Sequence, residues 1–134
     1  MTKLSLIEGI GPVYKEKLQA VGVRTVETLR QIGGTPEGRK ELAEKTGIGD
    51  EYILDWVNRA DLMRITGIGE EYSDLLECAG VDTVVELAQR NPSKLYGALL
   101  DLNEEKHLVR RPPSHSMVTR WIAEAKTLPR GVSY

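Results

Sequence analysis

A six-residue pattern, Gly-Ile-Gly-x-x-Tyr, occurs three times in this chain of 134 residues and constrains its fold more than any other feature. The copies span residues 9–14, 47–52 and 67–72, and a large apolar residue follows each tyrosine by four positions. Glycines on both sides of an apolar residue permit a tight turn, and residues four apart share one face of a helix. Each copy therefore predicts a turn that leads into a helix, with the isoleucine pointing inward. We name the glycine tripeptides hairpins one, two and three: Gly9-Ile10-Gly11, Gly47-Ile48-Gly49 and Gly67-Ile68-Gly69.

The repeat extends beyond the hairpins, because residues 7–31 and 65–89 are identical at about half of their positions. Apolar residues three apart before the first and third hairpins predict a short helix there. Residues typical of helix ends recur at matching places after the hairpins. Gly22 and Gly80 are expected C-cap glycines. Thr83 and Glu86 form an expected capping box, and Thr25 stands at the place in the first copy that matches Thr83. The pairs Thr35-Pro36 and Asn91-Pro92 are expected to open further helices.

A fourth, degenerate unit is predicted near the end of the chain. Aligning Trp56 with Trp121 places hairpin two over Pro112-Pro113-Ser114, where the glycines are lost but the serine is able to cap a helix. No segment shows the sustained alternation of a strand. The sequence therefore predicts an all-α fold of four helix-hairpin-helix units, arranged as two packed pairs at residues 1–59 and 60–134.

These hairpins between helices resemble the helix-hairpin-helix superfamily, and the order of the motifs looks like a bacterial domain of unknown function within it. The resemblance covers nearly the whole chain. It implies binding of double-stranded DNA without sequence reading, through hairpin amides that contact phosphates across the minor groove. A helix N-terminus offers free amides and the positive end of the helix dipole, which suits an anion. The residues carried over are Gly9, Ile10, Gly11, Val13, Lys15, Lys17, Gly47, Gly49, Gly67 and Gly69.

Acidic residues follow two of the hairpins and weigh against phosphate binding there. Asp50 and Glu51 follow hairpin two, and Glu70 and Glu71 follow hairpin three. Acids in the first turn also stabilise a helix by about 0.3 to 1 kcal/mol each, so helix stability alone explains their presence. Hairpin one and the basic region near the fourth unit remain as expected phosphate sites, whereas the alternative reading makes all the hairpins structural.

Charge is distributed unevenly along a chain whose net charge is -2. Residues 1–60 are neutral overall, residues 61–105 carry -7, and residues 106–134 carry +5. An acidic balance is unusual for a protein that coats nucleic acid. The basic run is either a solvated loop and helix face, or a contact for phosphate or for the acidic 61–105 segment of the same or another copy. Its members are Lys106, His107, Arg110, Arg111, His115 and Arg120.

Other classes of function find little support in the sequence. No apolar run is long enough for a membrane span or a signal peptide, and a lone Cys78 fits the reducing cytoplasm. Cys78 aligns with Ala20 and is expected to be a small core residue. His107 and His115 lack further ligands for zinc, and no catalytic constellation stands out, so we expect no metal, no cofactor and no enzyme. The tyrosines of the hairpins are expected to pack rather than to stack on bases.

Two functions remain open on these grounds. The leading hypothesis is a non-enzymatic module that binds double-stranded DNA weakly and without sequence preference, through hairpin one and the Arg110-Arg111 region. The alternative is an adaptor for protein partners or for self-association, in which the acidic 61–105 and basic 106–134 segments recognise partners. The resemblance favours the first, and the net charge and acidic hairpins favour the second.

Overall fold

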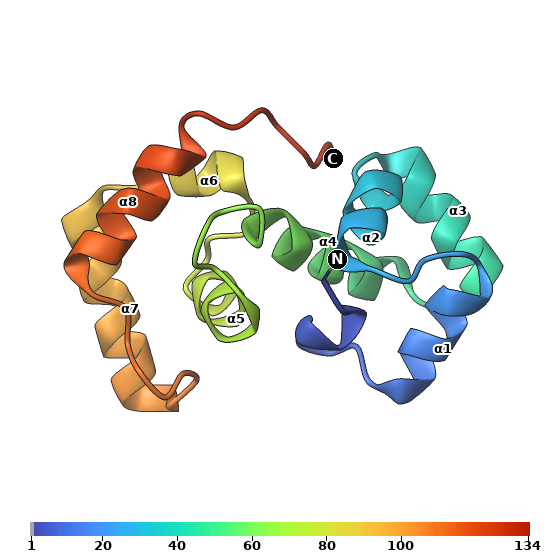
Figure 1. Cartoon of the computed structure of the whole chain (residues 1–134), viewed down its shortest axis with the longest axis horizontal. Coiled ribbons are helices and arrows are strands. Elements are labelled where there is room, and N and C mark those ends of the chain that lie inside the picture. Colours follow the sequence, from blue (N-terminus) through green and yellow to red (C-terminus); the bar gives the residue numbers. More distant parts are fainter. Residues whose placement is uncertain (1) are drawn as a thin grey trace. The chain divides into compact units, whose positions relative to one another are not determined.

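Helices make up the regular structure of the computed structural model, which describes residues 2–134 (Figure 1). In this range there are eight α-helices, one short 3-10 helix and no strand. A single isolated antiparallel bridge joins Lys3 to Thr25. The predicted all-α fold is confirmed.

The described chain divides into two compact units. Unit 1 contains residues 2–61 together with Gly131–Tyr134, and unit 2 is Leu62–Arg130. The sequence placed the division between residues 59 and 60 and assigned the whole C-terminal end to the second half. The last four residues instead belong with unit 1.

Unit 1 is built from one 3-10 helix and four α-helices: η1 (Leu4–Leu6), α1 (Pro12–Ala20), α2 (Val26–Gly33), α3 (Pro36–Thr46) and α4 (Asp50–Leu62). Thr25 and Thr35 open α2 and α3, since their hydroxyl oxygens accept the amides of Thr28 and Gly38, as the sequence predicts. Buried apolar side chains from all these helices form the core, among them Leu4, Leu18, Leu29, Leu42 and Ile53.

The ends of the chain are both bonded to unit 1. The amide of Thr2 donates to the Glu27 carboxylate at 2.8 Å, and this bond holds the pKa of Glu27 below its usual range. At the other end, the buried guanidinium of Arg39 donates to the carbonyls of Gly33 and Ser133 at 2.8 and 2.6 Å. Val132 beside them is fully buried. The C-terminal segment is therefore an integral part of the core of unit 1.

Unit 2 contains α5 (Glu70–Cys78), α6 (Val84–Ala88), α7 (Pro92–Lys106) and α8 (His115–Ala125). Helix α8 packs against both α6 and α7, and its apolar side chains join a continuous core with Leu75, Leu76, Leu87 and Leu99. No separate short helix precedes hairpin three, because α4 runs to Leu62 and is followed directly by turns. Asn91 caps α7 as predicted, by accepting the amide of Lys94.

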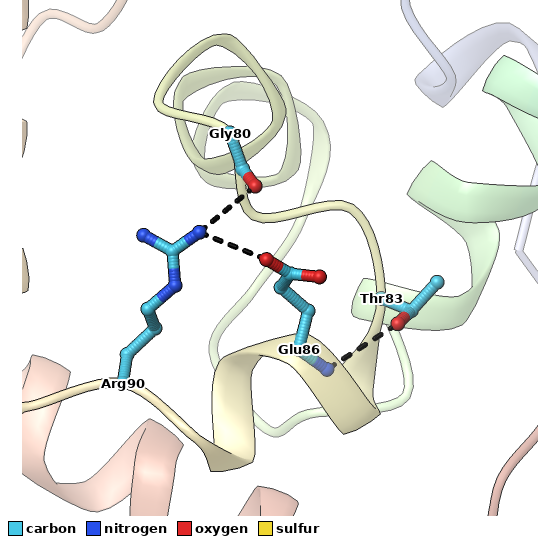
Figure 2. A network of polar contacts seen from close by, with 4 residues as sticks. All are labelled: Gly80, Thr83, Glu86 and Arg90. Carbon is cyan, nitrogen blue, oxygen red and sulfur yellow. Dashed lines mark hydrogen bonds and ion pairs between the residues drawn. The ribbon is translucent and has the colours of Figure 1, made fainter.

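The start of α6 departs from the predicted capping box (Figure 2). Thr83 does accept the amide of Glu86, at 3.4 Å. The Glu86 carboxylate, however, does not turn back to the amide of Thr83 but pairs with Arg90, and the same guanidinium nitrogen bonds the carbonyl of Gly80. Arg90 therefore ties Glu86 of α6 to the turn after α5, and this arginine four residues on competes for the carboxylate that a capping box would use.

One aromatic pair is repeated in both units with nearly the same geometry. The ring centroids of Tyr14 and Trp56 lie 5.1 Å apart at 58°, and those of Tyr72 and Trp121 lie 5.2 Å apart at 54°. Both tryptophans are buried. The tyrosine after the first hairpin of each unit thus packs on the tryptophan of that unit's last helix, as expected for side chains that pack.

Cys78 is not the core residue that the alignment predicted. It ends α5 with its side chain exposed, and Ala20 at the end of α1 is exposed as well. The alignment of the two residues is therefore sound, but a small residue at the last turn of a helix need not face the core. The deeper positions of this helix are taken by leucines.

Candidate functional site

The three hairpins share one geometry that directs the isoleucine inward and the backbone outward. Ile10, Ile48 and Ile68 are buried, whereas the glycines beside them are exposed or, at Gly49, half-buried. The first glycine of each hairpin has a positive φ, +96° at Gly9, +75° at Gly47 and +90° at Gly67. These are the backbone angles that a side chain disfavours. The prediction of an inward plug in a glycine turn is confirmed.

Hairpin one has an open helix start. The first turn of α1 contains no acidic residue, and its first amides have no partner within the helix. Val13 is 65% exposed, Lys15 is half-buried and Lys17 is exposed, and neither lysine makes an ion pair within residues 2–134. Glu8 before the hairpin is exposed and bonds none of these amides. This corner therefore presents amides and cations to solvent.

Hairpin two is covered by its own acidic side chain. The carboxylate of Glu51 folds back onto Gly49, with its Oε1 2.9 Å from the position that a Cβ of this glycine would take. Asp50 adds a second carboxylate in the first turn of α4. An incoming phosphate would meet two negative charges here, so this corner is a poor anion site.

Hairpin three is covered by a carboxylate from a distant part of unit 2. Glu124 of α8 accepts the amide of Thr66 at 3.2 and 3.3 Å through its two oxygens, and the Thr66 hydroxyl donates to it at 3.4 Å. Glu71, which follows the hairpin, is also engaged, since it accepts the amide of Arg110 at 3.3 Å. The amide of Thr66, directly before hairpin three, is therefore already bonded to a carboxylate of the chain itself.

Arg110 and Arg111 lie beside hairpin three. A hollow of about 370 Å³ is lined by Gly67, Gly69, Glu70, Glu71, Tyr72, Arg110 and Arg111. The Tyr72 hydroxyl donates to the carbonyl of Arg111 at 2.9 Å, and Arg110 Nε lies 3.8 Å from the Glu71 carboxylate. Hairpin one belongs to the other unit, so the structure groups these arginines with an acidic hairpin.

The fourth turn replaces the glycine hairpin with a longer loop. Ser114 caps α8, as predicted, by accepting the amide of Met117 at 3.2 Å. The left-handed residue that ends α7 is not near Pro112 but at His107, with φ of +52°, and its amide bonds the carbonyl of Asn103 at 2.7 Å. Buried Val109 and Pro113 plug the loop. The connection from α7 to α8 is therefore longer than the connection from α3 to α4.

The remaining members of the basic run are spread over the surface of unit 2. His115 bonds the Ser93 hydroxyl at 3.1 Å and packs edge-on against Tyr96. Arg120 lies beside Gly67, whereas Lys106 and His107 are exposed at the end of α7. The structure therefore gathers three arginines, at 110, 111 and 120, around hairpin three, and places the two histidines elsewhere.

The sequence anticipated one of the two carboxylates described here and missed the other. Glu51, two residues after Gly49, was expected to oppose a phosphate at hairpin two, and its side chain does lie over Gly49. Glu124 and Thr66 are 58 residues apart, and no spacing rule connects them. Within residues 2–134, no group of three or more His, Cys, Asp or Glu side chains is placed to hold a metal ion.

The fold and these corners define a class: a small all-helical protein with internally repeated glycine turns, three of them plugged by isoleucine. Among the described residues, none of the helices is long and apolar enough to cross a membrane. The chain belongs to the family described as "Domain of unknown function (DUF4332)", whose model matches residues 8–128. No curated protein and no solved structure matches it.

Proposed function

We propose that the chain is a non-enzymatic helix-hairpin-helix module that binds the phosphate backbone of double-stranded DNA weakly, without reading sequence. The observation that carries this proposal is the contrast among the hairpins. Carboxylates lie against Gly49 of hairpin two and on the amide of Thr66 directly before hairpin three. Hairpin one, in contrast, has no acid in its first helical turn and has unpaired lysines on the same helix. Hairpin one is accordingly the principal phosphate site.

The physical basis is the electrostatics of a helix start. The first amides of α1 and the dipole of the helix attract a phosphate oxygen, and Lys15 and Lys17 add two positive charges. Val13 offers an apolar surface for the sugar. Few phosphate contacts and a net charge of -2 give a low affinity that falls as salt displaces the protein from DNA.

Unit 2 contributes a second, weaker contact in this proposal. Arg111 and Arg120 make no ion pair within residues 2–134, and Arg110 has only a long, exposed contact with Glu71. Exposed pairs of this kind contribute little and exchange readily for a phosphate. The arginines add affinity but no sequence selectivity, since phosphate contacts position a protein without reading bases.

Fluorescence polarisation with a random-sequence duplex tests this proposal. At low salt we expect Lys15→Glu to weaken binding severalfold and to lower the slope of log affinity against log salt by about 1. Arg24→Glu is the matched control, because it makes the same charge change beyond the opposite end of α1. No binding of the unaltered chain at about 50 mM salt, or equal losses in both variants, would refute the DNA proposal.

The alternative is an adaptor that binds proteins through the same fold, and one observation favours it specifically. The chain places its own carboxylates against Gly49 of hairpin two and on Thr66 beside hairpin three, which disfavours two of the three glycine corners as anion sites. In this case the hairpins only shape the scaffold. The adaptor proposal predicts no duplex binding, and unchanged stability when duplex is added.

A further inference from the structure

A second hollow, separate from the arginine-lined one described above, lies between hairpin three and one face of α8. Its volume is about 460 Å³, and it is lined by Thr66, Gly67, Met117, Arg120, Trp121 and Glu124. The four α8 residues recur at helical spacing, so they form one wall of the hollow. Its size lies within the range of pockets that receive a ligand group, about 300 to 1,000 Å³.

The last helix of unit 1 differs at the position that matches Met117. Tyr52 and Met117 are the third residues of α4 and α8, and each stands four residues before the tryptophan of its helix. The ring of Tyr52 stacks near that of Trp56, with centroids 6.4 Å apart at 29°, and lies 6.1 Å from Tyr14. Trp56 therefore has two aromatic neighbours in unit 1.

The corresponding tryptophan of unit 2 lacks the second ring. Trp121 packs with Tyr72 alone among the described aromatic side chains. Met117 does not replace the missing ring, because its Sδ turns back to accept the amide of Ser114 at 3.5 Å. A methionine wall is deformable and makes favourable contacts with aromatic rings. Trp121 thus has one aromatic neighbour fewer than Trp56, and its side chain lines the hollow.

The charges at the rim of the hollow favour a ligand that carries an acidic group beside its apolar part. Glu124 is already bonded to the amide and hydroxyl of Thr66, so its negative charge is partly satisfied. The side chain of Arg120 is exposed and makes no hydrogen bond or ion pair within residues 2–134. An acidic side chain next to a ring bound in the hollow would pair with Arg120.

We propose that this hollow binds an aromatic side chain of a partner polypeptide, flanked by an acidic residue that pairs with Arg120. The bound ring gives Trp121 the second aromatic neighbour that Tyr52 gives Trp56. This goes beyond DNA binding, because it assigns a protein-directed surface to unit 2, which shares only Arg120 with the secondary phosphate contact proposed above. It also does not depend on hairpin one, so either proposal can fail while the other holds.

Nuclear magnetic resonance of the whole 15N-labelled chain tests this assignment, with the peptide acetyl-Glu-Tyr-Glu-amide as the probe. Trp121 Nε1 stands beside Gly67, and Trp56 Nε1 stands beside Gly9, so the two indole N–H signals are matched reporters. We expect the peptide to shift the Trp121 signal selectively. A peptide with leucine in place of tyrosine should bind about two- to tenfold more weakly.

Three variants and one control make the test specific. Met117→Tyr supplies the missing ring and should abolish the response of Trp121, while Tyr52→Met should open the equivalent place and make Trp56 respond. Arg120→Ala changes an exposed residue, so it tests the charge without repacking, and it should weaken binding about two- to fivefold. The control Lys126→Ala should leave the affinity unchanged.

Three results would overturn the proposal: equal responses of both indoles, unchanged affinity in a folded Met117→Tyr variant, or a stronger response to thymidine 5′-monophosphate than to the peptide.

Discussion

At the scale of single residues, the backbone angle at the end of a helix separates the fourth turn from hairpin two. Gly47 and His107 both end a helix in the left-handed conformation, and both amides bond the carbonyl four residues earlier. A histidine in this conformation is strained where a glycine is not. His107 is exposed and its side chain makes no described contact, so nothing else holds it there.

We predict that His107→Gly stabilises the protein. Glycine removes the strain of the left-handed conformation but adds conformational entropy to the unfolded chain. The first effect should be the larger, so we expect the free energy of unfolding to rise by roughly 0.5 to 1 kcal/mol. Gly47→Ala is the reciprocal control and should lower it by about 1 kcal/mol. Urea denaturation measures both, and a destabilised His107→Gly variant would show that the histidine side chain stabilises the turn.

At the scale of helices, the packing of α2 against α3 depends on a close approach that only glycine permits. A Cβ at Gly38 would collide with the carbonyl oxygen of Ile32 at the end of α2. The same residue donates its amide to the Thr35 cap. The helix cap and the helix contact therefore require the same residue.

We predict that Gly38→Ala lowers the free energy of unfolding by roughly 1 to 3 kcal/mol, because α2 and α3 must move apart. Gly97→Ala in α7 is the matched control, since no atom lies within 4 Å of its added Cβ. A mid-helix alanine should instead raise stability by about 0.5 to 1 kcal/mol. Thermal or urea unfolding compares the two, and equal effects would contradict a steric role for Gly38.

Local chemistry explains which elements were predictable. Glycine turns, threonine and asparagine caps and prolines act within a few residues, so the corners and several helix starts followed from the sequence. The Glu86–Arg90 pair and the exposed Cys78 were missed, because each depends on a choice between neighbours that a pattern does not rank. Glu124 over Thr66 was missed because tertiary folding alone brings the two residues together.

At the scale of the whole molecule, the chain returns to its first unit at its C-terminal end. Gly131–Tyr134 belongs to unit 1, where Ser133 also donates its amide to the carbonyl of Gly34. The predicted division between residues 59 and 60 assigned these four residues to the second half, because so short a segment carries no periodic signal. Unit 1 is therefore completed by residues that follow the whole of unit 2 in the sequence.

We predict that Val132→Ala destabilises unit 1 in particular. Val132 is fully buried, and loss of its methyl groups should cost roughly 1 to 3 kcal/mol. Hydrogen exchange should accelerate at the amides of α2 and α3 more than at those of α7. Ser133→Ala keeps both backbone bonds of an exposed residue and should change little, and faster exchange confined to unit 2 would contradict this role of the C-terminal segment.

The most direct measurement of the central claim is a titration of the 15N-labelled chain with a short duplex, followed amide by amide at low salt. If hairpin one is the principal phosphate site, the amides of Gly11, Val13 and Tyr14 should shift first and most. Those of Gly49 and Thr66, where carboxylates already lie, should move little. Larger shifts at hairpins two and three than at hairpin one, or no shifts at all, would contradict the account.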